Sequence, residues 1–335
     1  MKKCSIGGQA VMEGVMMKAP KTMAIAVRQS DGSIHVQKQS LVTIKDKYPI
    51  LRLPVLRGIV TFAETMVMGV KSLMTSAELF GEEEEPSRLE AFLAEKLGKK
   101  TEDVILYSAL VMAVVFALGL FILLPALLSG LIRPYIHKHV VVNLIEGVIR
   151  MILFLIYITL VSRMNDIRRV FEYHGAEHKT IHCYEHDEEL TVENARKYTT
   201  LHPRCGTAFL LIVMVISIVV YSFMGWQNIL IRILGRLLLL PLIAGLAYEV
   251  TQFAGNSDAR LIRIIMYPGM MLQKLTTREP DDSQLEVAIR AFQEAAGDLI
   301  QGEGGLEIET AADGGFDNRE SDAAEQGSRE CQAGM

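Results

Sequence analysis

Histidines recur at helical spacing in one stretch of the chain. Four of the eight histidines lie four residues apart, at positions 174, 178, 182 and 186. On an α-helix, residues i and i+4 share a face and drift by about 40° per step. We therefore expect His174 and His178 to reach one ion together, and His182 or Glu185 to join them from the next turn. Neutral imidazole is a common zinc ligand.

A glutamate lies inside the first histidine pair. The residues His174-Gly175-Ala176-Glu177-His178 match H-x-x-E-H, in which two histidines bind zinc and the glutamate acts on a bound water. Zinc lowers the pKa of such a water to about 7. The pattern predicts a divalent metal site, with zinc favoured and Glu177 as the catalytic residue. Three fixed positions also arise by chance, so the fourfold histidine repeat is the stronger signal.

Spacing alone leaves the rest of the ligand set open. Cys183 and Cys205 are not in C-x-x-C spacing, which excludes a structural zinc finger. A solvated or pH-sensitive histidine helix without metal is the alternative interpretation. The candidates for the third ligand are Glu185, His202, Cys205 and Glu249.

A second polar cluster, His202-Pro203-Arg204-Cys205-Gly206-Thr207, stands directly before an apolar run. Cys205 and Arg204 are therefore expected near a membrane surface, and Glu249 at about the same depth. An ionisable residue in a membrane segment suggests a functional site. The alternative for this cluster is a loop-to-helix junction with a snorkelling arginine.

The apolar runs that would carry these residues have membrane length. The chain has 335 residues, 50% of them hydrophobic, and a mean hydropathy of +0.27. Residues 104–132 and 205–231 carry no charge, and a bilayer core needs about 20 apolar residues in a helix. Residues 140–162 and 229–252 also qualify if their charges face protein. We expect four transmembrane helices; buried helices of a soluble domain are the alternative for the two interrupted runs.

Charged residues predict how the apolar runs pair and which of their connecting segments face the cytoplasm. Glu146 is expected to form a structural ion pair with Arg232 or Arg236. Residues 163–204 hold seven lysines and arginines, whereas residues 225–228 hold none. The positive-inside rule then places residues 163–204 and both termini in the cytoplasm. No cleaved signal peptide is expected.

The overall charge excludes one class of partner. Residues 297–335 are strongly acidic, and the remaining body, with 29 acidic and 32 basic residues, is only mildly basic. Nucleic-acid binding calls for a far more basic face, so the lipid bilayer is the expected partner. Four scattered cysteines exclude a disulfide framework.

The predicted fold is mainly α: a multi-pass helical membrane protein with a small N-terminal β-hairpin and cytoplasmic amphipathic helices. The hairpin spans residues 23–39 around Asp31-Gly32, and an amphipathic helix spans 55–80. A capping box at Ser283-Gln284-Leu285-Glu286 begins a helix ending at Gly297. Its buried face would hold Leu285, Ala288, Ile289 and Phe292.

We divide the chain into seven segments by composition. They are a glycine-rich motif and hairpin (1–50), amphipathic helices with an acidic linker (51–100), two membrane helices (101–163), the cytoplasmic histidine-rich segment (164–204), two further membrane helices (205–252), membrane-surface and capped helices (253–296), and a disordered acidic tail (297–335).

Several motifs together resemble one bacterial membrane-protein family. They are Gly7 to Met17, Tyr173 to Lys179, His202 to Thr207, Pro268-Gly269, Leu272-Gln273, and Thr276 to Pro280. The family is known as domain of unknown function 1385, or YqhQ-like, and is labelled "predicted metal-dependent enzyme". The resemblance, over roughly residues 4–295, implies a multi-pass membrane protein. It also points to Gly7, Gly8 and Gly14, which would let backbone approach another surface so that Glu13 supplies a carboxylate. In the alternative interpretation, these glycines only let the chain turn into the hairpin.

Two hypotheses about function follow. The first is a zinc-dependent hydrolase that acts at the membrane surface on a peptide segment or a lipid headgroup. The second is a non-catalytic membrane scaffold or assembly factor that docks a membrane-protein partner, with the histidine helix as a docking face or a structural metal clip. A transporter is a weaker third option, because four spans with few polar midplane residues offer little pathway. The sequence predicts neither the substrate nor the oligomeric state.

Overall fold

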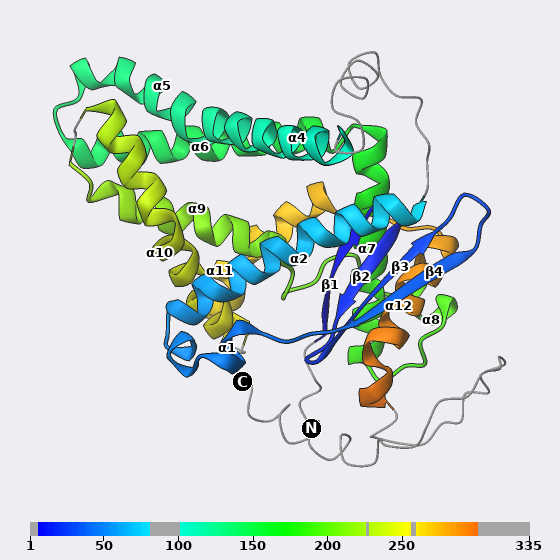
Figure 1. The fold of residues 1–335 in the computed structure, drawn as a ribbon. Helices are drawn as coiled ribbons and strands as arrows, with labels where there is room; N and C mark the ends of the chain where they lie inside the picture. The colour runs from blue at the N-terminus through cyan, green and yellow to red at the C-terminus, as the bar shows by residue number, and fades with distance from the viewer. Residues whose placement is uncertain (1–5, 81–100, 226–227, 256–258, 301–335) are drawn as a thin grey trace.

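The computed structural model describes residues 6–80, 101–225, 228–255 and 259–300. The predicted acidic linker at residues 82–85 lies outside these ranges, as does the predicted tail beyond residue 300. The described residues are mostly helical and carry one small sheet near the N-terminus (Figure 1).

The sheet is antiparallel and has four strands in the order β1-β2-β3-β4. They are β1 Gly7–Val11, β2 Gly14–Lys18, β3 Thr22–Arg28 and β4 Ile34–Ser40. The predicted hairpin is confirmed as β3 and β4, with Gly32 at φ +87° in the turn. Strands β1 and β2 were not predicted.

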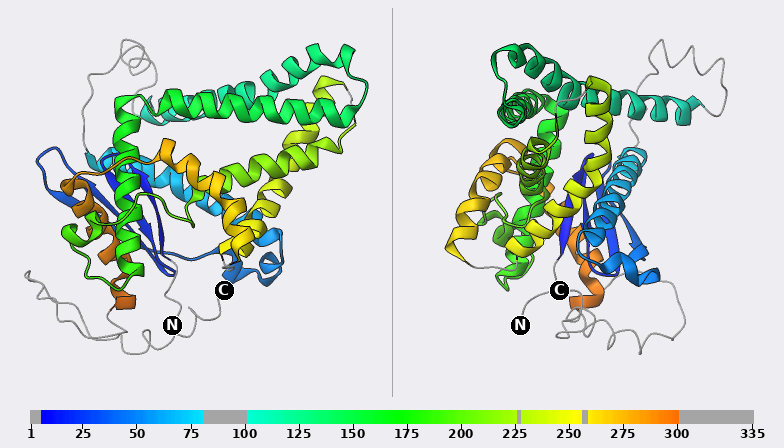
Figure 2. Two further views of the ribbon diagram at one scale, coloured as in Figure 1. Left: turned by 180° about the vertical axis from the view of Figure 1, so that it is seen from behind. Right: turned by 90° about the vertical axis from the view of Figure 1, so that its left-hand side faces the viewer.

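Helices cover both faces of the sheet. Side chains alternate between faces along a strand, and Val15 and Met17 of β2 pack toward α7 (Asn165–Glu185) and α12 (Asp282–Ile300). Met16, between them, packs on the other face toward α2 (Leu56–Phe80). Seen from behind, α7, α12 and the short α8 (Val192–Arg196) lie together on the face opposite α2 (Figure 2).

Helix α12 begins differently from the prediction. Asp281, rather than Ser283, accepts from the Gln284 N–H at 2.9 Å, and the Gln284 side chain accepts from the Asp281 N–H at 2.9 Å. The capping box is therefore Asp281-x-x-Gln284, two residues earlier. The helix also continues past Gly297 to Ile300. The predicted apolar face of Leu285, Ala288, Ile289 and Phe292 is buried as expected.

Three helical stretches are long and apolar enough, by length and composition, to cross a membrane: Ser108–Tyr135, His139–Val161 and Leu230–Gly255. The first comprises most of α4 (Thr101–Leu118), a π-helical turn η3 (Gly119–Leu123), α5 (Leu124–Ile132) and a 3-10 turn η4 (Arg133–Tyr135). The others are α6 (His139–Val161) and α10 (Ile229–Gly255).

The fourth predicted span is shorter than expected. Helix α9 (Gly206–Ser222) has 17 residues, which gives a length of about 26 Å against the roughly 30 Å of a bilayer core. It packs against α6, α10 and α11 (Arg260–Thr276). A Cβ added to Gly147 of α6 would lie 2.4 Å from Ile218 Cγ1, so this glycine permits the close α6–α9 approach.

The predicted ion pair between α6 and α10 is confirmed. Glu146 binds Arg236, and it also accepts from Arg150 at 3.2 Å and from the Ser129 hydroxyl at 3.0 Å. All four side chains are buried or nearly so. Glu146 therefore ties α5, α6 and α10 together through buried charge.

The predicted amphipathic helix over residues 55–80 is observed as α2. It follows two short elements, α1 (Ile44–Lys47) and η1 (Pro49–Arg52). Its N-terminal part packs against α10, where a Cβ on Gly58 would lie 2.7 Å from Tyr248 Cβ. Its C-terminal part covers the sheet, and Phe62, Met66, Val67 and Val70 remain exposed.

Candidate metal centre

Helix α7 directs the residues of the H-x-x-E-H motif to different neighbours. Gly175 faces the segment after α11, where an added Cβ would lie 2.0 Å from the Arg278 carbonyl oxygen. Ala176 enters the core beneath the sheet, and the buried Lys179 donates to the Arg196 carbonyl at 2.9 Å. His174 and His178 are left facing the loop of residues 199–205. Gly175, Ala176 and the adjacent Lys179 thus pack the other faces of the helix and leave the histidine face toward the loop.

Three residues form a first cluster, the first trio: His174, His178 and Cys205. Their ligand atoms all lie within 4.8 Å of one another. His174 Nδ1 donates to the Thr276 carbonyl at 2.8 Å, and His178 Nδ1 donates to the Thr200 carbonyl at 2.5 Å. A carbonyl oxygen only accepts, so each Nδ1 carries the proton and each Nε2 keeps its lone pair.

Those lone pairs are available near the Cys205 sulfur. His174 Nε2 lies 3.3 Å from Cys205 Sγ. His178 Nε2 is buried and makes no hydrogen bond within the described residues. An unsatisfied buried nitrogen is costly in a folded chain. Two imidazoles and a thiol with free lone pairs are a zinc-type donor set with a fourth position left for a water or substrate.

A second cluster, the second trio, continues along the same helix face. It contains His182, Glu185 and His202, again with ligand atoms within 4.8 Å of one another. His202 Nε2 lies 3.4 Å from Glu185 Oε2, and the His182 and His202 ring centroids are 4.7 Å apart. The His178 and His202 rings are separated by 5.6 Å, so the two trios are adjacent.

Burial favours the neutral form of three histidines in the two trios, His178, His182 and His202. Burial lowers the pKa of His178, although the Cys205 thiol partly opposes this. Burial also lowers the pKa of His182 and of His202, against the opposing effect of Glu185. Burial alone raises the pKa of Glu185, but His202 and Arg204 outweigh it and the pKa is lowered. Neutral imidazoles beside an ionised carboxylate are the protonation states that metal ligands require.

Glu177 lies on another side of α7, against the sheet. Its carboxyl group packs on β1, where a Cβ on Gly8 would lie 3.0 Å from Glu177 Cδ. Burial raises the pKa of Glu177, and the nearby His174 and a hydrogen bond from the Gly8 N–H only partly oppose this. Glu177 is in neither trio. Gly8 is needed here because a Cβ would lie 2.7 Å from the Met16 carbonyl oxygen of β2 as well as close to the glutamate.

The other sequence-predicted residues divide between the site and distant pairs. His182, Glu185, His202 and Cys205 are brought together as described, and Arg204 binds Glu185 Oε1. Glu13 instead binds Arg169 and lies 3.4 Å from the Tyr173 hydroxyl. Glu249 accepts from Arg57 and, at 3.1 Å, from the Val55 N–H, so it joins α10 to α2 rather than entering a trio.

Sequence reasoning missed the residues that orient the ligands. Gln273 accepts from the His202 N–H and donates to the His202 carbonyl, both at 2.8 Å. The carbonyls of Thr200, Leu201 and Thr276 hold imidazole nitrogens. Gln273 and Thr276 belong to motifs that carry the family resemblance. Their spacing in the sequence does not predict their contacts with the histidines.

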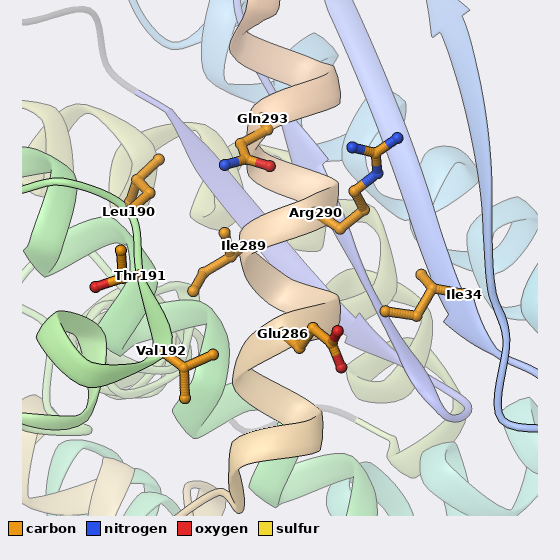
Figure 3. A pocket seen from close by; sticks show the side chains of 8 residues that line it. All are labelled: Ile34, Leu190, Thr191, Val192, Glu286, Ile289, Arg290 and Gln293. Atoms are coloured by element: carbon orange, nitrogen blue, oxygen red, sulfur yellow. The ribbon is translucent and has the colours of Figure 1, made fainter. Parts of the chain in front are cut away.

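A separate hollow of about 460 Å³ opens between β4, α8 and α12 (Figure 3). Val192 and Ile289 lie on one side of it and Ile34 on the other, with Glu286 and Arg290 of α12 between them. It contains none of the residues of the two trios. The histidine site is therefore distinct from this hollow.

Comparison with known proteins assigns the chain to a family. The family described as "Protein of unknown function (DUF1385)" matches residues 53–298, and the chain belongs to this family. The chain is similar to the "Uncharacterized protein YqhQ" of Bacillus subtilis (strain 168), with 37% identity over 293 residues. That alignment covers 86% of this chain and 91% of the relative. No solved structure matches the chain.

Proposed function

We propose that this chain is an integral membrane metalloprotein, a metal-dependent hydrolase that acts at the cytoplasmic membrane surface. The observation that carries the proposal is the first trio, in which backbone carbonyls turn two imidazoles so that their lone pairs lie near Cys205. Three protein ligands with one open position are typical of catalytic zinc sites, whereas structural sites use four.

The donor geometry fits zinc. Bonds of about 2.0–2.1 Å to nitrogen and about 2.3 Å to sulfur imply a nitrogen–sulfur separation of about 3.5 Å around a tetrahedral ion. His174 Nε2 and Cys205 Sγ are 3.3 Å apart. A metal would also satisfy the buried His178 Nε2. When bound, zinc supplies Lewis-acid activation of a water or a carbonyl.

The residues around the trio have defined roles in this proposal. Thr276 and Thr200 fix the tautomers of His174 and His178 through their carbonyls. Burial keeps His178 neutral by lowering its pKa, so its lone pair is available at neutral pH. Cys205 is the N-cap of α9, and the Thr207 N–H points to its sulfur at 3.5 Å, so the start of α9 holds the sulfur beside the two imidazoles.

The proposed location follows from chain connectivity and charge. Three residues separate the end of α6 from the start of α7, and α9 begins directly after Cys205. Cys205 would then lie at the start of the apolar helix α9, and the two histidines on the helix that follows the apolar α6. The seven basic residues of the 163–204 segment favour its cytoplasmic placement, with both termini on the same side. A peptide segment or lipid headgroup at that surface is the substrate class that suits this position.

One observation favours the competing function, a membrane scaffold with a structural metal clip. The Glu177 carboxyl group packs against Gly8 and lies outside the trio, which does not suit a general base at the ion. In that case the metal would hold the 199–205 loop on α7, and a membrane-protein partner would dock on the cytoplasmic elements.

Metal content tests the proposal first. Elemental mass spectrometry on detergent-purified protein should find near-stoichiometric zinc or another transition metal, which the His174→Ala/His178→Ala variant loses. His186→Ala is the matched control, because His186 belongs to the same stripe but is exposed and in neither trio. Well-folded wild-type protein without metal would contradict the proposal.

Glu177→Gln then separates the two functions. Hydrolysis of peptide and phospholipid probes should fall in this variant if Glu177 acts as base, with the metal retained. If wild-type protein holds metal but hydrolyses none of these probes, and Glu177→Gln retains partner binding, the scaffold function is the better account.

A further inference from the structure

We infer that the second trio, His182, Glu185 and His202, is a second metal site beside the first. The inference goes beyond the proposed function, which needs only one ion, and rests on it only in treating the first trio as metal-binding. Its two imidazoles and one carboxylate, which come from α7 and the loop of residues 199–205, would bind a divalent first-row transition-metal cation.

One separation in this trio suits a shared ion as well as the long hydrogen bond that the pair makes without one. His202 Nε2 and Glu185 Oε2 are 3.4 Å apart. A neutral N–H···O bond is most often about 2.9–3.0 Å long. Zinc-type bonds of about 2.1 Å to nitrogen and oxygen place two ligand atoms about 3.4 Å apart in a tetrahedral shell. The observed pair therefore already has the spacing that a shared ion imposes.

Other groups hold the side chains of this trio in place. Arg204 binds Glu185 Oε1, which leaves Oε2 facing His202. His182 Nε2 donates to the Leu201 carbonyl at 2.9 Å, so its Nδ1 keeps the lone pair. The two hydrogen bonds from Gln273 hold the backbone of His202 in place. Such outer contacts are the means by which proteins orient metal ligands.

The two sites should differ in strength. His202 Nδ1 accepts from the Arg204 N–H at 3.3 Å, so in the neutral ring Nε2 carries the proton. Binding a metal at Nε2 moves that proton to Nδ1 and ends this contact. The first trio needs no such change, because carbonyls already hold its protons on Nδ1. We expect the second site to fill after the first and to bind at least about tenfold more weakly.

The ligand chemistry also differs, which makes the sites distinguishable. The first trio contains the thiol of Cys205, a soft ligand, whereas the second contains a carboxylate and no sulfur. A cobalt ion in the first site should therefore show thiolate-to-cobalt charge transfer in the near ultraviolet. A cobalt ion in the second site should show only its visible ligand-field bands.

The experiment is a Co²⁺ titration of chelator-treated full-length protein in detergent. We expect two equivalents to bind, with the charge-transfer band complete after the first. Glu185→Gln and His182→Ala should each bind one equivalent with the band intact. Cys205→Ser should lose the band and still bind one equivalent. His186→Ala should behave as wild type, and circular dichroism checks that each variant is folded.

The outcomes separate the two proposals. A single equivalent with the charge-transfer band, unchanged in Glu185→Gln, overturns the second site and leaves the proposed function standing. Two equivalents that Glu185→Gln and His182→Ala do not reduce also overturn it. Cobalt that binds without the band, and is lost in Glu185→Gln, supports the second site and contradicts the first. No cobalt in folded wild-type protein overturns both.

Discussion

The side-chain amide of Gln273 pairs with the backbone of His202 through two hydrogen bonds of 2.8 Å, as one strand pairs with its neighbour. Both residues are buried, and 71 positions separate them in the chain. The contact joins α11 to the loop that carries His202 and Cys205. The loop's place over the histidines of α7 therefore depends on a residue that binds no metal in our proposals.

Gln273→Ala should destabilise the protein by about 2–4 kcal/mol, because it leaves a buried N–H and a buried carbonyl unpaired. It should also weaken the second cobalt equivalent more than the first. Thermal unfolding and the cobalt titration measure these effects. Gln293→Ala, on α12 away from the trios, should change the free energy of unfolding by less than about 0.5 kcal/mol. Equal effects of the two substitutions would contradict the positioning role.

Gly175→Ala should lower the free energy of unfolding by about 3 kcal/mol or more, because the added Cβ would lie 2.0 Å from the Arg278 carbonyl oxygen. The backbone of α7 and the backbone at Arg278 meet here, so neither can easily move away. Gly297→Ala is the control, since nothing lies within 4 Å of its added Cβ in α12. Helix propensity predicts that this control stabilises by up to about 1 kcal/mol. Unfolding midpoints in detergent compare the two, and a mild Gly175→Ala would argue against the close crossing.

Asp281→Ala should cost about 1 kcal/mol at neutral pH through loss of the α12 N-cap, whereas Ser283→Ala, which removes one hydrogen bond to Asp281 but leaves the cap in place, should cost less. Burial alone raises the pKa of Asp281, but hydrogen bonds from Ser283 and Gln284 outweigh it, and the pKa is lowered. A lowered folded-state pKa gives stability that is present above the unfolded value of about 3.9 and is lost as pH falls through the folded one. The difference between wild type and Asp281→Ala should therefore shrink below about pH 4 in unfolding midpoints measured across pH. A constant difference would exclude this ionic contribution.

Glu146→Gln should destabilise by about 3–5 kcal/mol, because it leaves Arg236 and Arg150 buried without their counter-charge. Glu294→Gln removes a carboxylate from an exposed pair with Arg290 and should change stability by less than about 1 kcal/mol. Denaturant unfolding in detergent measures both. Similar values for the two would mean that the buried charges find other partners.

Zinc at one hundred times its dissociation constant should stabilise wild-type protein by about 2.7 kcal/mol for each site filled. His186→Ala should gain as much. Cys205→Ser/Glu185→Gln, which disrupts both trios, should gain nothing, and a chelator should reverse the gain in wild type. The measurement is the unfolding midpoint with and without zinc. A gain retained in the double variant would place zinc elsewhere on the protein.

The sequence predicted those parts of the fold that have a strong local pattern. Alternation around Asp31-Gly32 identified β3 and β4, and the histidine spacing identified α7. Strands β1 and β2 were hidden because Gly7, Gly8 and Gly14 have low strand propensity and the turn between them lacks an Asn-Gly pair. The apolar run over residues 205–231 gave one long span because no charged residue marks the end of α9 at Ser222.

The site was predictable where ligands share one helix, and unpredictable where distant segments meet. His174 and His178 follow from the helical period, but the Gln273 and Thr276 contacts arise from tertiary packing. Helix geometry alone could also have predicted the direction of the Glu177 side chain. A helix turns by about 100° per residue, so Glu177 projects about 60° from His174 and about 100° from His178. That offset carries its side chain to β1 rather than to the trio.

The support that α11 gives to the histidines has a consequence for how the protein is made. Translation completes the ligand atoms of the first trio at Cys205, yet the carbonyl that orients His174 belongs to Thr276, and Gln273 is synthesised in the same late segment. Helices α9 and α10 emerge between them. A nascent chain that ends before α11 thus has all three ligands of the first trio but lacks the carbonyl that orients His174. If the first trio binds metal as proposed, we expect metal capture to be a late step of biogenesis that follows synthesis of α11.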